Sequence, residues 1–110
     1  MNTSHIQFLI SEIYNVTNTI NKRIQAFDIL YSLYDSEYSF NVMLYIIRKS
    51  NEDLFADELR RAIVNKYLYN LLTPSRSQHL INMIDNWDNR HLKFDELAQY
   101  VLSKCQNLTH

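Results

Sequence analysis

The chain contains no glycine in 110 residues and only one proline, Pro74. A typical chain of this length would carry about eight glycines. Glycine supplies positive φ angles and lets the backbone approach a ligand closely. Its absence therefore excludes glycine-rich phosphate loops, dinucleotide-binding fingerprints and nucleophile elbows. Two-residue β-hairpin turns are disfavoured as well, so we expect a fold of helices joined by short polar segments.

Apolar side chains recur every three or four residues along almost the whole chain, which is the spacing of one helix face. The first run extends from Ile6 to Tyr34 and contains a polar stretch, Asn15 to Lys22, that is a poor helix former. The run is either one helix over residues 4–34 with a weak or kinked middle, which we favour, or two helices broken near Asn18.

Further helices follow, separated by polar breaks. The spacing places them at about residues 40–49, 55–71, 74–87 and 94–105. Ser50 and Asp53 offer a capping box before the second of these, and Thr73 with Pro74 predicts the start of the third. Since asparagine is the next-best residue after glycine for left-handed helix ends, we expect asparagines to terminate helices here. The sequence predicts one all-α domain over residues 1–110, a compact bundle of four to six mostly antiparallel helices.

Charge and cysteine content indicate the compartment. The net charge is −1, so the chain as a whole does not attract nucleic acid. There is no apolar run long enough to cross a membrane, and Met1 to Ile10 lacks the pattern of a secretory signal. Cys105 is the only cysteine, lies on an apolar helix face and cannot form an internal disulfide. We therefore expect a cytoplasmic protein with an inert, buried thiol.

Residues that would carry catalysis or bind a metal ion form no complete motif. His79 and His91 are isolated, and two ligands do not make a zinc site. Residues 85–96 partly match a calcium-binding loop, but Trp87 stands where an oxygen ligand is needed and Arg90 where the sharp turn needs glycine. We expect no enzyme activity, no cofactor and no bound metal.

The first turn of the helix after Pro74 is the best candidate for nucleic-acid binding. Arg76, Gln78 and His79 follow a short break, as in the recognition helix of a helix-turn-helix. Arg76 is the only cation there, and the usual small turn residue is missing. A small DNA-binding regulator is therefore an alternative and not the leading hypothesis.

Acidic residues and one tyrosine are the main candidates for binding a partner. Acids in the first turn of a helix interact favourably with its dipole, and an exposed acidic surface also steers a basic partner. Tyrosine is favoured at interface hot spots, and Tyr38 falls off the apolar stripes. Glu52, Asp53, Asp57 and Glu58 form one acidic group, and Asp35 and Glu37 would extend it if the two neighbouring helices pack as a hairpin. The predicted partner-binding residues are Asp35, Glu37, Tyr38, Glu52, Asp53, Asp57 and Glu58.

One helical domain, no active site, and acidic and tyrosine residues at helix ends make a profile similar to that of small helical immunity proteins. The resemblance is one of class and not of a sequence motif. It implies a cytoplasmic inhibitor that neutralises a bacterial toxin, such as a nuclease, by binding it directly. A phage-encoded inhibitor of a host defence nuclease would have the same profile. The amphipathic first helix also allows a homo-oligomer.

Overall fold

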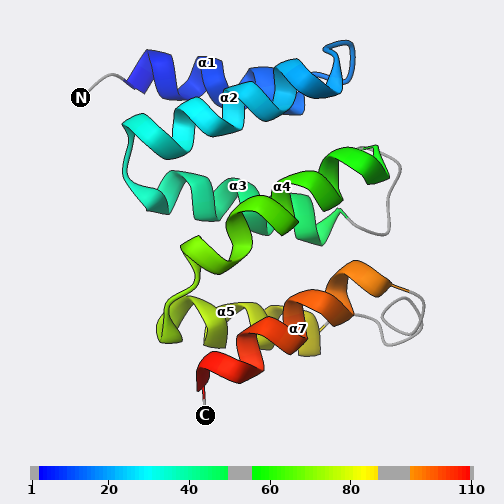
Figure 1. The fold of residues 1–110 in the computed structure, drawn as a ribbon. Helices are drawn as coiled ribbons and strands as arrows, with labels where there is room; N and C mark the ends of the chain where they lie inside the picture. Colours follow the sequence, from blue (N-terminus) through cyan, green and yellow to red (C-terminus); the bar gives the residue numbers. More distant parts are fainter. Residues whose placement is uncertain (1–2, 50–55, 87–94, 110) are drawn as a thin grey trace.

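The computed structural model describes residues 3–49, 56–86 and 95–109, and Figure 1 shows the chain as a ribbon. The described ranges hold six helices and no strand, which confirms the all-α prediction. The helices are α1 (Thr3–Tyr14), α2 (Ile20–Leu33), α3 (Ser36–Arg48), α4 (Asp57–Leu71), α5 (Pro74–Asp85) and α7 (Glu96–Thr109). No helix in these ranges combines the length and the apolar character needed to cross a membrane.

The helices pack as three antiparallel pairs, α1–α2, α3–α4 and α5–α7, which are stacked one on the next (Figure 1). Helix α2 contacts both helices of the middle pair, and α4 contacts α7. The stack measures 35 × 28 × 20 Å. The α1–α2 pair lies at one end of the stack and the α5–α7 pair at the other, so each has an outer side that no other described pair covers.

One hydrophobic core runs through all three pairs, and aromatic contacts join the first pair to the second. Tyr67 of α4 packs on Phe27 and on Tyr31 of α2, with ring centroids 4.8 Å apart in each case. Tyr14 of α1 packs on Tyr45 of α3 at 4.5 Å. These rings are buried or half-buried, as expected for residues on the apolar stripes. Tyr100 of α7, in contrast, is exposed.

Of the two alternatives for residues 4–34, the favoured single helix is wrong and the two helices broken near Asn18 are confirmed, because the chain leaves the helix after Tyr14 and re-enters it at Ile20. Asn15 Oδ1 accepts hydrogen bonds from the backbone N–H and the hydroxyl of Thr17, at 3.0 and 2.7 Å. This local turn competes with the helix for the backbone donors. Thr19 then caps α2 through its side-chain oxygen. The polar stretch that weakens a helix therefore forms the turn that folds α2 back on α1.

The expectation of left-handed asparagines at helix ends is also wrong, since no described residue has a positive φ. Tyr34 and Leu72 follow α2 and α4 in extended conformations. Lys49 ends α3 at φ −88° and ψ 8°, and Asn86 ends α5 at φ −90° and ψ 2°. All of these conformations are open to residues that carry a Cβ. The chain therefore ends its described helices without any position that requires glycine.

The predicted helix start at Thr73 is confirmed. Thr73 Oγ1 accepts a hydrogen bond from the backbone N–H of Arg76 at 3.2 Å, and Pro74 occupies the first helical position. The predicted capping box at residues 50–53 and most of the calcium-loop segment lie outside the described residues. Helix α4 begins after Ala56, which makes no side-chain cap.

Candidate partner-binding surfaces

Asp35, Glu37 and Tyr38 lie together at the start of α3. Asp35 is the N-cap, and its Oδ1 accepts a hydrogen bond from the backbone N–H of Glu37 at 2.9 Å. The side chain of Glu37 is exposed and has no hydrogen-bond or ion-pair partner among the described residues. Tyr38 is half-buried against the core. Asp35 therefore starts the helix, whereas the Glu37 carboxylate is available to a partner.

Asp57 and Glu58 lie in the first turn of α4, and only one of them has partners. Asp57 pairs with Arg60 at 2.8 Å and with Arg61 at 2.7 Å. The hydrogen bond from Arg61 and the charges of both guanidinium groups lower the pKa of Asp57. Glu58 is exposed and pairs with no described residue. The other two predicted acids, at positions 52 and 53, lie outside the described residues.

The α3 and α4 starts do not form one acidic surface. Because α3 and α4 run antiparallel, their N-termini lie at opposite ends of the pair (Figure 1). Helix α3 has 13 residues, which corresponds to a length of about 20 Å. The structure thus has an α3 acidic end, with Asp35 and Glu37, and an α4 acidic end, with Asp57 and Glu58, at opposite ends of this pair.

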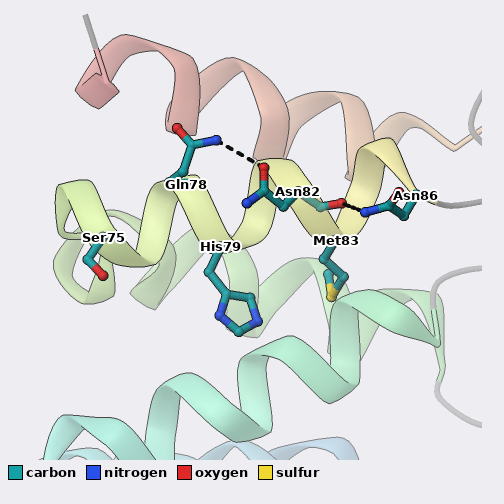
Figure 2. Close-up of a pocket in the computed structure, with 6 residues that line it drawn as sticks. All are labelled: Ser75, Gln78, His79, Asn82, Met83 and Asn86. Atoms are coloured by element: carbon teal, nitrogen blue, oxygen red, sulfur yellow. Dashed lines mark hydrogen bonds between the residues drawn. The ribbon is translucent and has the colours of Figure 1, made fainter.

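A groove that the sequence did not predict runs along α5, although two of the residues that line it, Gln78 and His79, belong to the DNA-binding alternative. It is an open depression of about 610 Å³, lined by Ser75, Gln78, His79, Asn82, Met83 and Asn86. In Figure 2 the His79 and Met83 side chains extend to the side of α5 where α3 runs, and Gln78 Nε2 donates to Asn82 Oδ1 at 3.0 Å. The spacing of three and four residues was a readable sign of one polar helix face. Amide groups both donate and accept hydrogen bonds, so this groove suits an uncharged polar ligand.

Arg76, the cation of the DNA-binding alternative, makes contacts within the protein. One guanidinium nitrogen donates to the carbonyl of Leu71 at 3.1 Å and the other to Ser36 Oγ at 2.9 Å. The guanidinium carbon lies 5.1 Å from the ring centroid of Phe40. Arg76 therefore joins the start of α5 to α3 and to the end of α4, and His79 packs edge-on against the same ring.

The described residues offer neither a reactive thiol nor a cluster of metal ligands. Cys105 is fully buried on α7, and burial raises the pKa of its thiol to about 11. At neutral pH the thiol is protonated and is not a nucleophile. Among the described residues, no three His, Cys, Asp or Glu side chains are grouped so as to hold a metal ion.

Comparison of the chain with protein-family models, curated proteins and solved structures gave no match. The function is therefore inferred from the residues themselves.

Proposed function

We propose that this protein is an inhibitor that acts by binding another protein, as an immunity protein that neutralises a bacterial toxin such as a nuclease. The observation that carries the proposal is the state of Glu37 and Glu58. Both are exposed carboxylates in the first turn of a helix, and neither pairs with another described residue. Exposed surface charges of this kind steer the approach of a basic partner.

The predicted acids divide into structural and available groups. Asp35 caps α3, and Asp57 holds two arginines of α4. A partner that recruited Asp57 would have to replace those ion pairs, which reduces the gain from binding. Glu37 and Glu58 carry no such cost. Tyr38 lies one residue from Glu37 and can supply the aromatic contact that anchors many interfaces.

The separation of the two acidic ends constrains the partner. They lie about 20 Å apart along the α3–α4 pair. One partner would meet both ends only with a basic surface of that length, such as the nucleic-acid groove of a nuclease. A phage-encoded inhibitor of a host nuclease would use the same two ends, and the identity of the partner separates these two roles.

The test begins with a tagged pull-down from cells of the native host, read by mass spectrometry. Binding of the captured partner is then measured by surface plasmon resonance at several salt concentrations, with Glu37→Lys, Glu58→Lys and the double variant. We expect the double variant to lower the association rate by about tenfold and to flatten its salt dependence.

The matched control is Asp85→Lys, which changes the charge by the same amount at an exposed position at the end of α5. Equal effects of this control and of Glu37→Lys would show that only net charge matters. Unchanged kinetics in a folded double variant would contradict the role of the two acidic ends. Recovery of duplex DNA and no protein partner would contradict the inhibitor proposal.

A further inference from the structure

The outer side of the α1–α2 pair carries exposed apolar side chains. Phe8 is 55% exposed, Ile29 41% and Leu33 64%. A groove of about 260 Å³ lies between the two helices, lined by Phe8, Leu9, Glu12, Lys22, Gln25, Ala26 and Ile29. Single exposed apolar residues are common, but a group of them around a groove is typical of an interaction surface. We call the exposed side chains of Phe8, Ile29 and Leu33, with the groove that Phe8 and Ile29 help to line, the α1–α2 outer face.

This face points away from the rest of the molecule. Phe8 lies six residues before Tyr14, which contacts α3, and at about 100° per residue the two side chains leave α1 about 120° apart. Ile29 lies two residues before Tyr31, which contacts α4, and their side chains leave α2 about 160° apart, in nearly opposite directions. The outer face is therefore on the side of the pair opposite to the middle pair.

Two opposite charges beside the groove, Glu12 and Lys22, are placed so that they would pair between two copies related by a two-fold axis. Glu12 lies near the end of α1 and Lys22 near the start of α2, so the two residues flank the same end of the groove from opposite helices. A two-fold axis along the groove would place α1 of one copy over α2 of a second copy. Glu12 would then face Lys22 of the second copy, and the reciprocal contact would form as well. Any arrangement of this kind also places each helix antiparallel to its neighbours.

We propose that a second copy of this chain docks on the α1–α2 outer face, so that the two α1–α2 pairs form an antiparallel four-helix bundle. Such bundles bury apolar side chains between facing helices that cross at small angles. Helices of 12 and 14 residues, each about 10 Å wide, give a flat footprint of about 400 Å² per copy. This is below the roughly 800 Å² per partner of a standard interface, so the dimer is reversible and not obligate.

The dimer leaves the proposed inhibitor surfaces accessible. The α3 and α4 acidic ends belong to the middle pair and not to the outer face (Figure 1). A dimer would thus present two copies of each acidic end. The docking proposal rests on the outer face alone and does not depend on the proposed function.

The first experiment measures the molar mass of the full chain by sedimentation equilibrium from micromolar to millimolar concentration. We expect a monomer–dimer equilibrium. Ile29→Asp should raise the dimer dissociation constant by at least about tenfold, because it places an unpaired charge in an apolar contact. The matched control is Tyr69→Asp, which replaces an exposed apolar side chain on α4, 70% exposed, and should leave the equilibrium unchanged. Circular dichroism establishes that both variants keep their helix content.

A monomeric wild-type chain at millimolar concentration would overturn the proposal, whatever other protein is found on the outer face. An equal loss of dimer with Tyr69→Asp would also overturn it, because the contact would then not be specific to the α1–α2 pair.

The second experiment tests the two-fold arrangement by disulfide trapping. Glu12→Cys and Lys22→Cys chains are mixed in equal amounts and oxidised, and Cys105 does not interfere because it is buried. We expect the mixed dimer in clear excess over either dimer of identical chains. A random distribution, or a preference for identical chains, would contradict this geometry. Glu12 also accepts a hydrogen bond from Asn18 Nδ2, so the helix content of that variant is verified first.

Discussion

Replacing Arg76 with alanine should lower the free energy of unfolding by about 2 to 3 kcal/mol, because this side chain joins three helices. Its guanidinium donates to the carbonyl of Leu71 at the end of α4 and to the hydroxyl of Ser36 at the start of α3. It also lies over the ring of Phe40. Arg76 thereby links the middle pair to the α5–α7 pair, beside the connection between α4 and α5.

The magnitude follows from these contacts. A hydrogen bond from a charged donor contributes about 1.5 kcal/mol at the lower end of the usual range, and a cation–π contact at a partly exposed site about 0.5 kcal/mol. Together the two hydrogen bonds and the ring contact would contribute about 3.5 kcal/mol if no water replaced them in the variant. Because Arg76 and Ser36 are half-buried, water recovers part of the loss, and the net effect is about 2 to 3 kcal/mol.

Urea denaturation followed by circular dichroism measures this loss, and the slope of the transition should stay unchanged. Arg76→Lys should lose about half as much, because an ammonium group cannot reproduce the two-pronged geometry of a guanidinium. Arg61→Ala is the matched control, since the ion pairs that Arg61 makes with described residues, Asp57 and Glu96, are exposed, and it should cost less than about 1 kcal/mol.

A loss for Arg76→Ala no larger than that for Arg61→Ala would refute the reasoning. It would mean that the Arg76 guanidinium does not link the pairs and is free to meet a ligand, as the DNA-binding alternative requires. A less-than-additive effect in the double variant with Ser36→Ala would attribute part of the energy to that one hydrogen bond.

Two further predictions concern pH and helix capping. Burial, with the neighbouring Tyr45, raises the pKa of Tyr14 to about 12, and burial raises that of Cys105 to about 11. Folding therefore favours the neutral forms, and this stability is fully present below about pH 9 and lost as the pH rises to about 12. The midpoint of thermal unfolding should fall over that interval, and less so in Tyr14→Phe; an equal fall in both would contradict the assignment to Tyr14. Thr73→Ala should lower the free energy of unfolding by about 1 kcal/mol, while Thr73→Ser, which keeps the cap, should be nearly neutral in urea denaturation. Equal losses in the two variants would show that the cap does not stabilise α5.

Of the predictions that depend on short-range chemistry, the start of α5 agrees with the structure and the left-handed asparagines do not. Thr73 and Pro74 start α5 because a cap needs only an oxygen that reaches a backbone N–H three residues later. The sequence also showed that the helix is weak after Tyr14, but it did not show that the chain turns back there. Propensity shows that a helix is weak there, whereas the choice between a kink and a turn depends on what α2 gains by packing on α1.

The candidate surfaces were less predictable than the helices. The sequence places Glu58 in the first turn of a helix and leaves Glu37 in the break before one. The structure puts both in first turns, and the direction of the α3–α4 pair sets them about 20 Å apart. The sequence singles out Gln78 and His79 on α5, but it does not show the groove that they help to line. That Arg76 lies inward was not readable, because its partner Ser36 is forty residues away in the chain.

The absence of glycine and the three-to-four-residue apolar spacing were enough to determine an all-α chain, because backbone permissiveness and helix periodicity are local properties. Which charged side chains are available to a partner was decided only by the tertiary structure. Packing brings residues that are distant in the chain within hydrogen-bond range, so it engages Arg76 in the fold and leaves Glu37 exposed. The same packing leaves the α1–α2 pair at the end of the stack, with an apolar face whose partner the fold itself does not provide.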